Sequence, residues 1–267
     1  MSELLQAEAA YEIPKSGFTD WKVIAKQLGQ KSLLSVVEKM DSESTGRGNA
    51  HGEIAERLGR MGLPVQKFVS PSVEDFVGNP GAYLNDLPSG DYYFVSIKPG
   101  THLTHAVDES DIVLFAKSFL YENPNDSDTE MYISHNGEPV LSGHILVRND
   151  GEPNTIHAEF TNGEFNAFHR GRHTPEVSVH RSNYRFEWKF NGALASDDDW
   201  RTSEQFTCNG GIELNRTEIA KRLFNAINLI PKDGNIYLPG YYEVLLERTE
   251  LGKTRTVFIE ANGHSDI

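Results

Sequence analysis

Two acidic side chains near the C-terminus have the spacing of a metal site. Glu243 lies in the apolar run YYEVLLE and Glu260 in the run TVFIEAN, and the charged turn RTELGK stands between the runs. Two such runs predict adjacent antiparallel strands that bring the two carboxylates side by side. Asn262 follows Glu260 by two residues, so strand alternation places both side chains on one face. Three oxygen ligands of this kind suit Mg²⁺, which completes its shell with water and phosphate.

The alternative is an exposed hairpin whose acids face water. Two facing carboxylates with no cation between them repel each other, so their pairing needs a reason.

Two further segments have the chemistry to hold a nucleotide. Lys98 ends the apolar strand YYFVSIKPG, and a lysine on a buried strand either reaches solvent or neutralises an anion such as a phosphate. Residues 113–141 have the pattern of a strand, a polar turn and a second strand opened by Glu130. An extended connector between two lobes offers backbone groups to a purine edge, and Glu130 can accept a hydrogen bond from a ribose hydroxyl. The alternatives are a lysine that points at solvent and a plain β-connection.

A basic stretch at 168–190 stands out in an otherwise acidic chain. If its strands face a cleft, Arg170 and Arg172 can bind a transferring phosphoryl group or an anionic acceptor. The interleaved aromatic residues also permit stacking on single-stranded nucleic acid, although the net charge disfavours it. The alternative is a solvated β-face whose cations balance nearby acids.

Composition predicts a globular protein and disfavours several classes of partner. The 267 residues are 38% hydrophobic and 24% charged, enough for one large domain or two lobes. The net charge of −14 argues against nucleic acid and anionic membranes. The sequence contains no signal-peptide pattern, no run of about 20 apolar residues and a single cysteine, Cys208. We therefore expect a cytoplasmic protein without a membrane segment.

Hydrophobic periodicity and turn residues predict the elements that position these groups. The expected helices are 21–40, 53–65 up to a glycine stop, a segment capped by Ser70 or Ser72, and 215–230 capped by Asn215 or Thr217. The expected strands are 65–69, 91–100, 111–121, 129–135 and the C-terminal pair, with a hairpin over 135–152 and a strand-rich stretch over 155–192. This order favours an α+β or α/β fold with two lobes.

In this order the motifs resemble those of the ATP-grasp superfamily, whose enzymes hold ATP between two α+β lobes. AHGEIAERLGRMGLPVQKFVSPSVEDF is similar to the first-lobe helix, turn and strand, and YYFVSIKPG to the strand that ends in a phosphate-contacting lysine. LFAKSFLYENPNDSDTEMYI resembles the interlobe hinge, and YYEVLLE…TVFIEAN resembles the metal-binding pair of the biotin carboxylase branch. The resemblance covers residues 46–262.

The resemblance implies an α+β, two-lobe ATP-grasp-like fold with an antiparallel, β-rich C-terminal lobe. Its expected parts are an N-terminal helical segment (1–45), a first lobe (46–115) and a second lobe (116–267). It also implies roles for residues that match the motifs. These are Lys98 on an ATP phosphate; Lys117 and the backbone near Phe119 and Leu120 beside adenine; Glu130 near the ribose; and Glu243, Glu260 and Asn262 on one or two Mg²⁺ ions.

Three departures from the family pattern bear on activity. KPGTHLTHAVDES carries one glycine where the family has a glycine-rich loop, His51 lies near the position of an earlier family lysine, and no arginine follows Asn262.

The implied function is an ATP-dependent ligase that activates a carboxylate as an acyl phosphate and joins it to an amine. Its substrate would be an unidentified small molecule or peptide. The alternatives are a kinase on the same scaffold and a degenerate domain that binds nucleotide or a partner without turnover. Because 45 residues cannot supply the family's separate substrate domain, a homo-oligomer or a partner protein is an open possibility.

Overall fold

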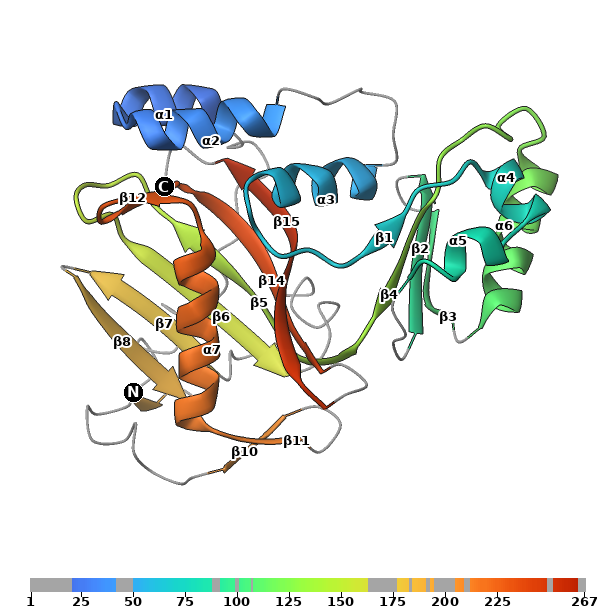
Figure 1. Ribbon diagram of the computed structural model, residues 1–267. Coiled ribbons are helices and arrows are strands. Elements are labelled where there is room, and N and C mark those ends of the chain that lie inside the picture. Colours follow the sequence, from blue (N-terminus) through green and yellow to red (C-terminus); the bar gives the residue numbers. More distant parts are fainter. Residues whose placement is uncertain are drawn as a thin grey trace, which may run out of the picture.

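The chain forms two lobes, each built on an antiparallel sheet (Figure 1). This arrangement confirms the predicted α+β class with a β-rich C-terminal lobe. The computed structural model describes residues 21–41, 50–87, 92–98, 101–106, 108–162, 177–182, 184–190, 193–194, 205–208, 212–248 and 252–263. None of the helices within these ranges is long and apolar enough to cross a membrane.

The larger lobe contains seven described strands in the order β15-β14-β5-β6-β7-β8-β9. Every neighbouring pair is antiparallel. The strands are β5 (Glu138–Val147), β6 (Ile156–Asn162), β7 (Val177–Ser182), β8 (Arg185–Phe190), β9 (Ala193–Leu194), β14 (Gly240–Arg248) and β15 (Thr254–Gly263). Two separate two-stranded pairs also form: β10 (Gln205–Cys208) with β11 (Ile212–Asn215), and β12 (Lys232–Asp233) with β13 (Ile236–Tyr237).

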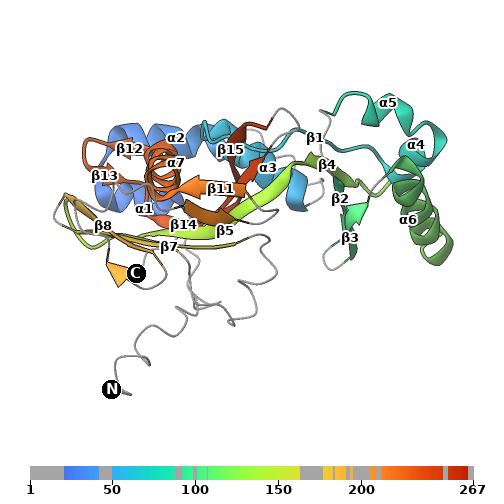
Figure 2. The ribbon, with the colours of Figure 1, turned by 90° about the horizontal axis from the view of Figure 1, so that it is seen from below.

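Helices cover one face of this sheet, and Figure 2 shows α1, α2 and α7 together on that face. They are α1 (Trp21–Leu28), α2 (Lys31–Asp41), α3 (Ala50–Arg60) and α7 (Arg216–Leu229). Their apolar side chains share one hydrophobic core with the inward-facing residues of the strands. The single helix predicted over 21–40 is wrong in one respect, since Gly29 at φ +68° separates α1 from α2. The predicted helix over 215–230 is confirmed, and Asn215 with Glu218 forms its capping box.

The smaller lobe has the strand order β1-β4-β2-β3 and its own core. Its strands are β1 (Phe68–Val69), β2 (Tyr92–Lys98), β3 (Thr101–Ala106) and β4 (Tyr132–Asn136). Its helices are α4 (Val73–Gly78), which Ser72 caps, α5 (Gly81–Leu84) and α6 (Glu109–Glu122). The domain boundary expected between residues 115 and 116 falls inside α6, and α1 and α2 pack into the core of the larger lobe.

The strand predicted over 111–121 is wrong, because these residues form most of α6. The helix begins at a capping box made by Asp108 and Asp111. Its buried residues Ile112, Ala116 and Phe119 follow the four- and three-residue spacing of a helix. The high content of apolar and aromatic residues favoured a strand, but the capping box and the helical spacing of the buried residues favour the helix that forms.

The hairpin predicted over 135–152 is also wrong. Strand β4 ends at Asn136 in the smaller sheet, and β5 begins at Glu138 in the larger one, so the Asn136-Gly137 pair joins the two lobes. A Cβ atom on Gly137 would lie 2.3 Å from the carbonyl oxygen of Arg248. This glycine therefore permits a close backbone approach between the connection and β14 rather than a tight turn.

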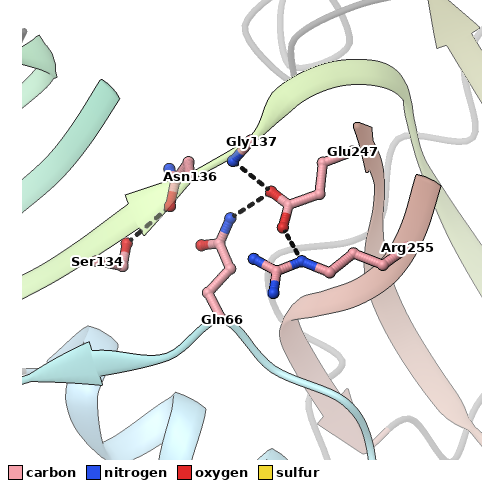
Figure 3. A network of polar contacts seen from close by, with 6 residues as sticks. All are labelled: Gln66, Ser134, Asn136, Gly137, Glu247 and Arg255. Carbon is pink, nitrogen blue, oxygen red and sulfur yellow. Dashed lines mark hydrogen bonds and ion pairs between the residues drawn. The ribbon is translucent and has the colours of Figure 1, made fainter. Parts of the chain in front are cut away.

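A buried carboxylate lies at the junction of the lobes (Figure 3). One oxygen of Glu247 accepts hydrogen bonds from the backbone N–H of Gly137 (3.2 Å) and from Nε2 of Gln66 (3.1 Å). Nε of Arg255 donates to the other oxygen. Gln66 lies between α3 and β1, and Gly137 lies between β4 and β5. Both segments that cross between the lobes are thus attached to one fully buried side chain.

Gly137→Ala tests the close approach at the junction. The added methyl group would overlap the backbone of Arg248, so we expect the free energy of unfolding to fall by about 1–3 kcal/mol. Gly78→Ala is the matched control, because a Cβ atom there meets nothing within 4 Å. Urea unfolding should leave this control within about 1 kcal/mol of the wild type. Equal free energies of unfolding for the two variants would contradict the close backbone approach at Gly137.

Candidate active site

The paired carboxylates of the C-terminal hairpin lie where the sequence predicted. In the register of β14 and β15, Glu243 stands opposite Glu260 and Tyr241 opposite Asn262. Nδ2 of Asn262 donates to Oε1 of Glu260 at 2.8 Å, and the hydroxyl of Tyr241 donates to Oε1 of Glu243 at 3.0 Å. A β-bulge lies between Glu243 and Val244. Both acids and the carboxamide therefore occupy one face of the sheet.

Burial and like charge both act on the acidic pair at this position. Glu243 is 6% exposed. Burial, followed by the negative charge of Glu260, raises the pKa of Glu243 to about 7, while the hydrogen bond from Tyr241 acts in the opposite direction. Burial and the charge of Glu243 also raise the pKa of Tyr241. At neutral pH the pair is therefore stabilised by a proton or by a cation.

The donor set fits a hard cation. Two carboxylates and a carboxamide oxygen are ligands that Mg²⁺ accepts, with water and phosphate oxygens completing its shell. Among the residues that the structure describes, no group of three or more His, Cys, Asp and Glu side chains is arranged to hold a metal ion. A metal at Glu243 and Glu260 would therefore depend on Asn262 and on oxygens supplied with the nucleotide.

A polar row continues from this pair across two more strands, and the sequence analysis missed it. His144 on β5 stands opposite Glu243 on one side and opposite Glu159 of β6 on the other. Nε2 of His144 lies 3.9 Å from Oε2 of Glu159, and Nε2 of His157 lies 3.1 Å from Oε1 of Glu159. The available signal was the alternation of polar and apolar residues in β6, which places His157 and Glu159 on one face.

Lys98 is held by an acid of its own lobe. Its Nζ donates to Oδ2 of Asp126 at 2.5 Å and lies 5.2 Å from the centre of the Phe119 ring. Asp126 follows the end of α6, and the side chain of Lys98 is 41% exposed. The structure thus brings Lys98 and Phe119 together, with a carboxylate as the anion that the lysine contacts.

The other residues predicted to contact ATP do not lie on an extended connector. Lys117, Phe119 and Leu120 belong to α6, whose backbone groups are engaged in helical hydrogen bonds, and Phe119 is buried in the core of the smaller lobe. Glu130 precedes β4 and forms a β-bridge with Ser72. The extended connection between the lobes is instead at 136–138. The adenine and ribose roles of these four residues stay predictions.

The basic stretch is only partly described. Arg170 and Arg172 lie outside the described residues, so their predicted role is untested. Arg181 belongs to the same stretch and is buried, with its guanidinium 5.7 Å from the Phe186 ring centre and 5.1 Å from that of Tyr237.

Comparison with known proteins gives matches among solved structures only; no family model and no curated protein matches. Three of the solved structures that the chain matches at low identity are ligases or synthases. A D-alanine–D-alanine ligase from Bacillus anthracis complexed with ATP has 14% identity and a TM-score of 0.36, over 90% of this chain and 62% of that one. A carboxyaminoimidazole ribonucleotide synthase from Aspergillus clavatus complexed with ATP has 10% identity and a TM-score of 0.40, over 91% and 50%. An L-amino acid ligase from Bacillus licheniformis has 12% identity and a TM-score of 0.37, over 95% and 52%.

The chain spans between half and two thirds of the length of these three proteins. At TM-scores of 0.40 or less the likenesses are weak.

Glu243→Gln tests the electrostatics of the carboxylate pair. The fold raises the pKa of Glu243 from 4.5 to about 7. At pH values between these two pKa values, Glu243 is protonated in the folded state and ionised in the unfolded state. Its contribution to the free energy of unfolding is therefore lost as the pH rises. Relative to the variant, the free energy of unfolding of the wild type should fall by on the order of 3 kcal/mol between about pH 5 and about pH 8.

The measurement is urea unfolding at several pH values, with Glu187→Gln as the control. Glu187 is an exposed residue on β8, and its replacement should leave the pH dependence unchanged. If the free energy of unfolding has the same pH dependence in the wild type and in Glu243→Gln, the raised pKa of Glu243 is contradicted.

Proposed function

We propose that this chain binds Mg-ATP between its lobes and activates a carboxylate as an acyl phosphate, which an amine then attacks. The observation that carries the proposal is the direct opposition of Glu243 and Glu260 with Asn262 on the same face. Like charges opposed in a sheet are unfavourable unless a cation or a proton lies between them. The ATP-grasp-like order of motifs along the chain supports the same reading, and the likeness to the biotin carboxylase branch stays a prediction.

The metal would be held by Glu243, Glu260 and Asn262. When bound there, Mg²⁺ would neutralise phosphate charge and orient the nucleotide. Lys98 and the two predicted arginines, Arg170 and Arg172, are proposed to contact the phosphates. Lys98 is half-exposed and already binds one anion, so exchange of Asp126 for a phosphate oxygen costs little.

The adenine position is proposed at the connection between the lobes. A purine edge can be bound by the backbone groups of an extended segment, and the chain has such a segment between the lobes at 136–138, whereas 109–122 form helix α6. Polar side chains of Gln66 and Asn136 lie beside it (Figure 3). We therefore place the purine next to this connection.

A nucleotide-binding module without turnover is the second candidate function. The ion pair between Lys98 and Asp126 favours it, because the lysine has an anionic partner within its own lobe. The glycine-poor sequence KPGTHLTHAVDES favours it as well, since glycine-rich loops are the ones whose backbone amides cover phosphates.

Glu260→Gln tests the metal assignment by nucleotide-dependent stabilisation. A ligand that binds only the folded state adds RT ln(1 + [L]/Kd), about 2.7 kcal/mol at a hundredfold excess over Kd. We expect Mg-ATP to raise the Tm of the wild type by about 5–10 °C at that excess. The variant should show a much smaller rise, while Glu187→Gln should match the wild type.

Two outcomes test the metal site and nucleotide binding, and three more discriminate between the functions. An equal Mg²⁺-dependent rise in wild type and Glu260→Gln would remove Glu260 from the metal site, and no rise in the wild type would exclude both ligase and kinase. Release of ADP with free phosphate supports the ligase. Retention of the phosphate on the product supports a kinase, and binding without ADP formation supports the module.

A further inference from the structure

Glu159 lies on the face of the larger sheet that carries the proposed metal ligands, and one of its carboxylate oxygens accepts no hydrogen bond from a described residue. Glu159 lies in the row Glu260–Glu243–His144–Glu159, whose members stand opposite one another on β15, β14, β5 and β6. Because neighbouring strands are about 4.8 Å apart, Glu159 stands about 10 Å from Glu243 along the row. A small molecule bound above the row can therefore contact both positions.

The two oxygens of Glu159 differ in their partners. Oε1 is 3.1 Å from Nε2 of His157, which is a hydrogen bond. Oε2 is 3.9 Å from Nε2 of His144, which is beyond hydrogen-bonding distance. Within the part of the chain that the structure describes, this oxygen accepts no hydrogen bond, although the side chain is only 18% exposed. A partly desolvated carboxylate oxygen without a donor is a site for an N–H group.

The protonation state of Glu159 suits a cationic ligand. Burial alone would raise the pKa of Glu159, but the hydrogen bond from His157 and the positive charges of His157 and His144 lower it overall. The group is therefore ionised at neutral pH. It binds cations as an anion and is a poor base.

We propose that Glu159 binds the ammonium group of the acceptor substrate, with His157 fixing the orientation of its carboxylate and His144 bordering the same site. This inference rests on the proposed function, because only an amine-consuming reaction gives such a subsite its role. The position fits that role, since the acyl phosphate would form above Glu243 and Glu260, two strands away. The bound ammonium would lose one proton to water before its nitrogen attacks the acyl carbon and displaces phosphate. The class of acceptor is then a small primary amine rather than an alcohol or a thiol.

An anion is the competing ligand, since two histidines border the site. The geometry favours the ammonium, because the acceptor that lacks a hydrogen bond is Oε2 of the Glu159 carboxylate. An anion would lie against an ionised Glu159 and be repelled.

Glycinamide is the probe for this site, because it offers a primary ammonium without a carboxylate that Glu159 would repel. Histidine Hε1 signals are followed by NMR in the full chain while glycinamide is added, and His157→Gln assigns the signal of His157. We expect a saturable shift of the His157 signal in the wild type. Glu159→Gln should weaken the apparent affinity by about tenfold or more, and Glu159→Asp, which keeps the charge, should weaken it less.

The control variant is Glu187→Gln, which removes an exposed acid on β8 of the same sheet and should bind glycinamide as the wild type does. The control ligand is tetramethylammonium, which has the charge but no N–H donor and should give no saturable shift. Circular dichroism and Tm confirm that each variant is folded.

The outcomes separate this inference from the proposed function. Absence of a saturable shift in the wild type, an equal shift in Glu159→Gln, or a shift lost only in Glu243→Gln would each overturn the ammonium site. Mg-ATP binding is measured by calorimetry on the same samples. Glycinamide binding without Mg-ATP binding would leave the ammonium site standing and remove the ligase, and the reverse result would do the opposite.

Discussion

Strand β14 pairs with β15 on one side and with β5 on the other, and its register decides what each polar group of the larger sheet meets. Tyr242, Val244 and Leu246 alternate along the strand and are locked into the core beneath the helices. The residues between them must then face the other way, which places Glu243 between Glu260 and His144. A register shift of one residue would bury the carboxylates in the core. Apolar packing on one face of the sheet therefore fixes which polar side chains lie together on the other face.

The same strand ends at the lobe junction, where Glu247 carries a buried charge. A buried carboxylate is tolerated only when its hydrogen-bonding capacity is used, and here the donors are Gly137, Gln66 and Arg255. Two of these donors belong to the segments that join the lobes. One element therefore both carries the candidate metal ligands and anchors the connections beside which a nucleotide would lie, and this couples the position of the smaller lobe to the site.

Sequence patterns predicted correctly those elements whose contacts lie between residues that are near each other in the sequence. The C-terminal hairpin followed from alternation and a charged turn, and α7 followed from its cap and period. The apolar run at 111–121 was ambiguous, because its composition suits a strand while its capping box and buried spacing are helical. Asn136-Gly137 is typical of a hairpin turn, yet tertiary contact with Arg248 made it the connection between lobes. The row through His144 and Glu159 depends on pairing between strands far apart in sequence, which alternation within one strand cannot supply.

The candidate site has acidic groups on the larger lobe and a lysine on the smaller lobe, so the two lobes can bind ligand groups of opposite charge. On the larger lobe, Glu243 and Glu260 stand opposite each other, and a positive charge there would relieve their repulsion. On the smaller lobe, Lys98 is satisfied by Asp126, but this half-exposed pair is a weak one that a phosphate can replace. A magnesium–nucleotide complex carries both signs of charge at once. Its metal would bind the acids of the larger lobe, and its phosphates would bind the lysine of the smaller lobe. Both lobes would then contact the same ligand.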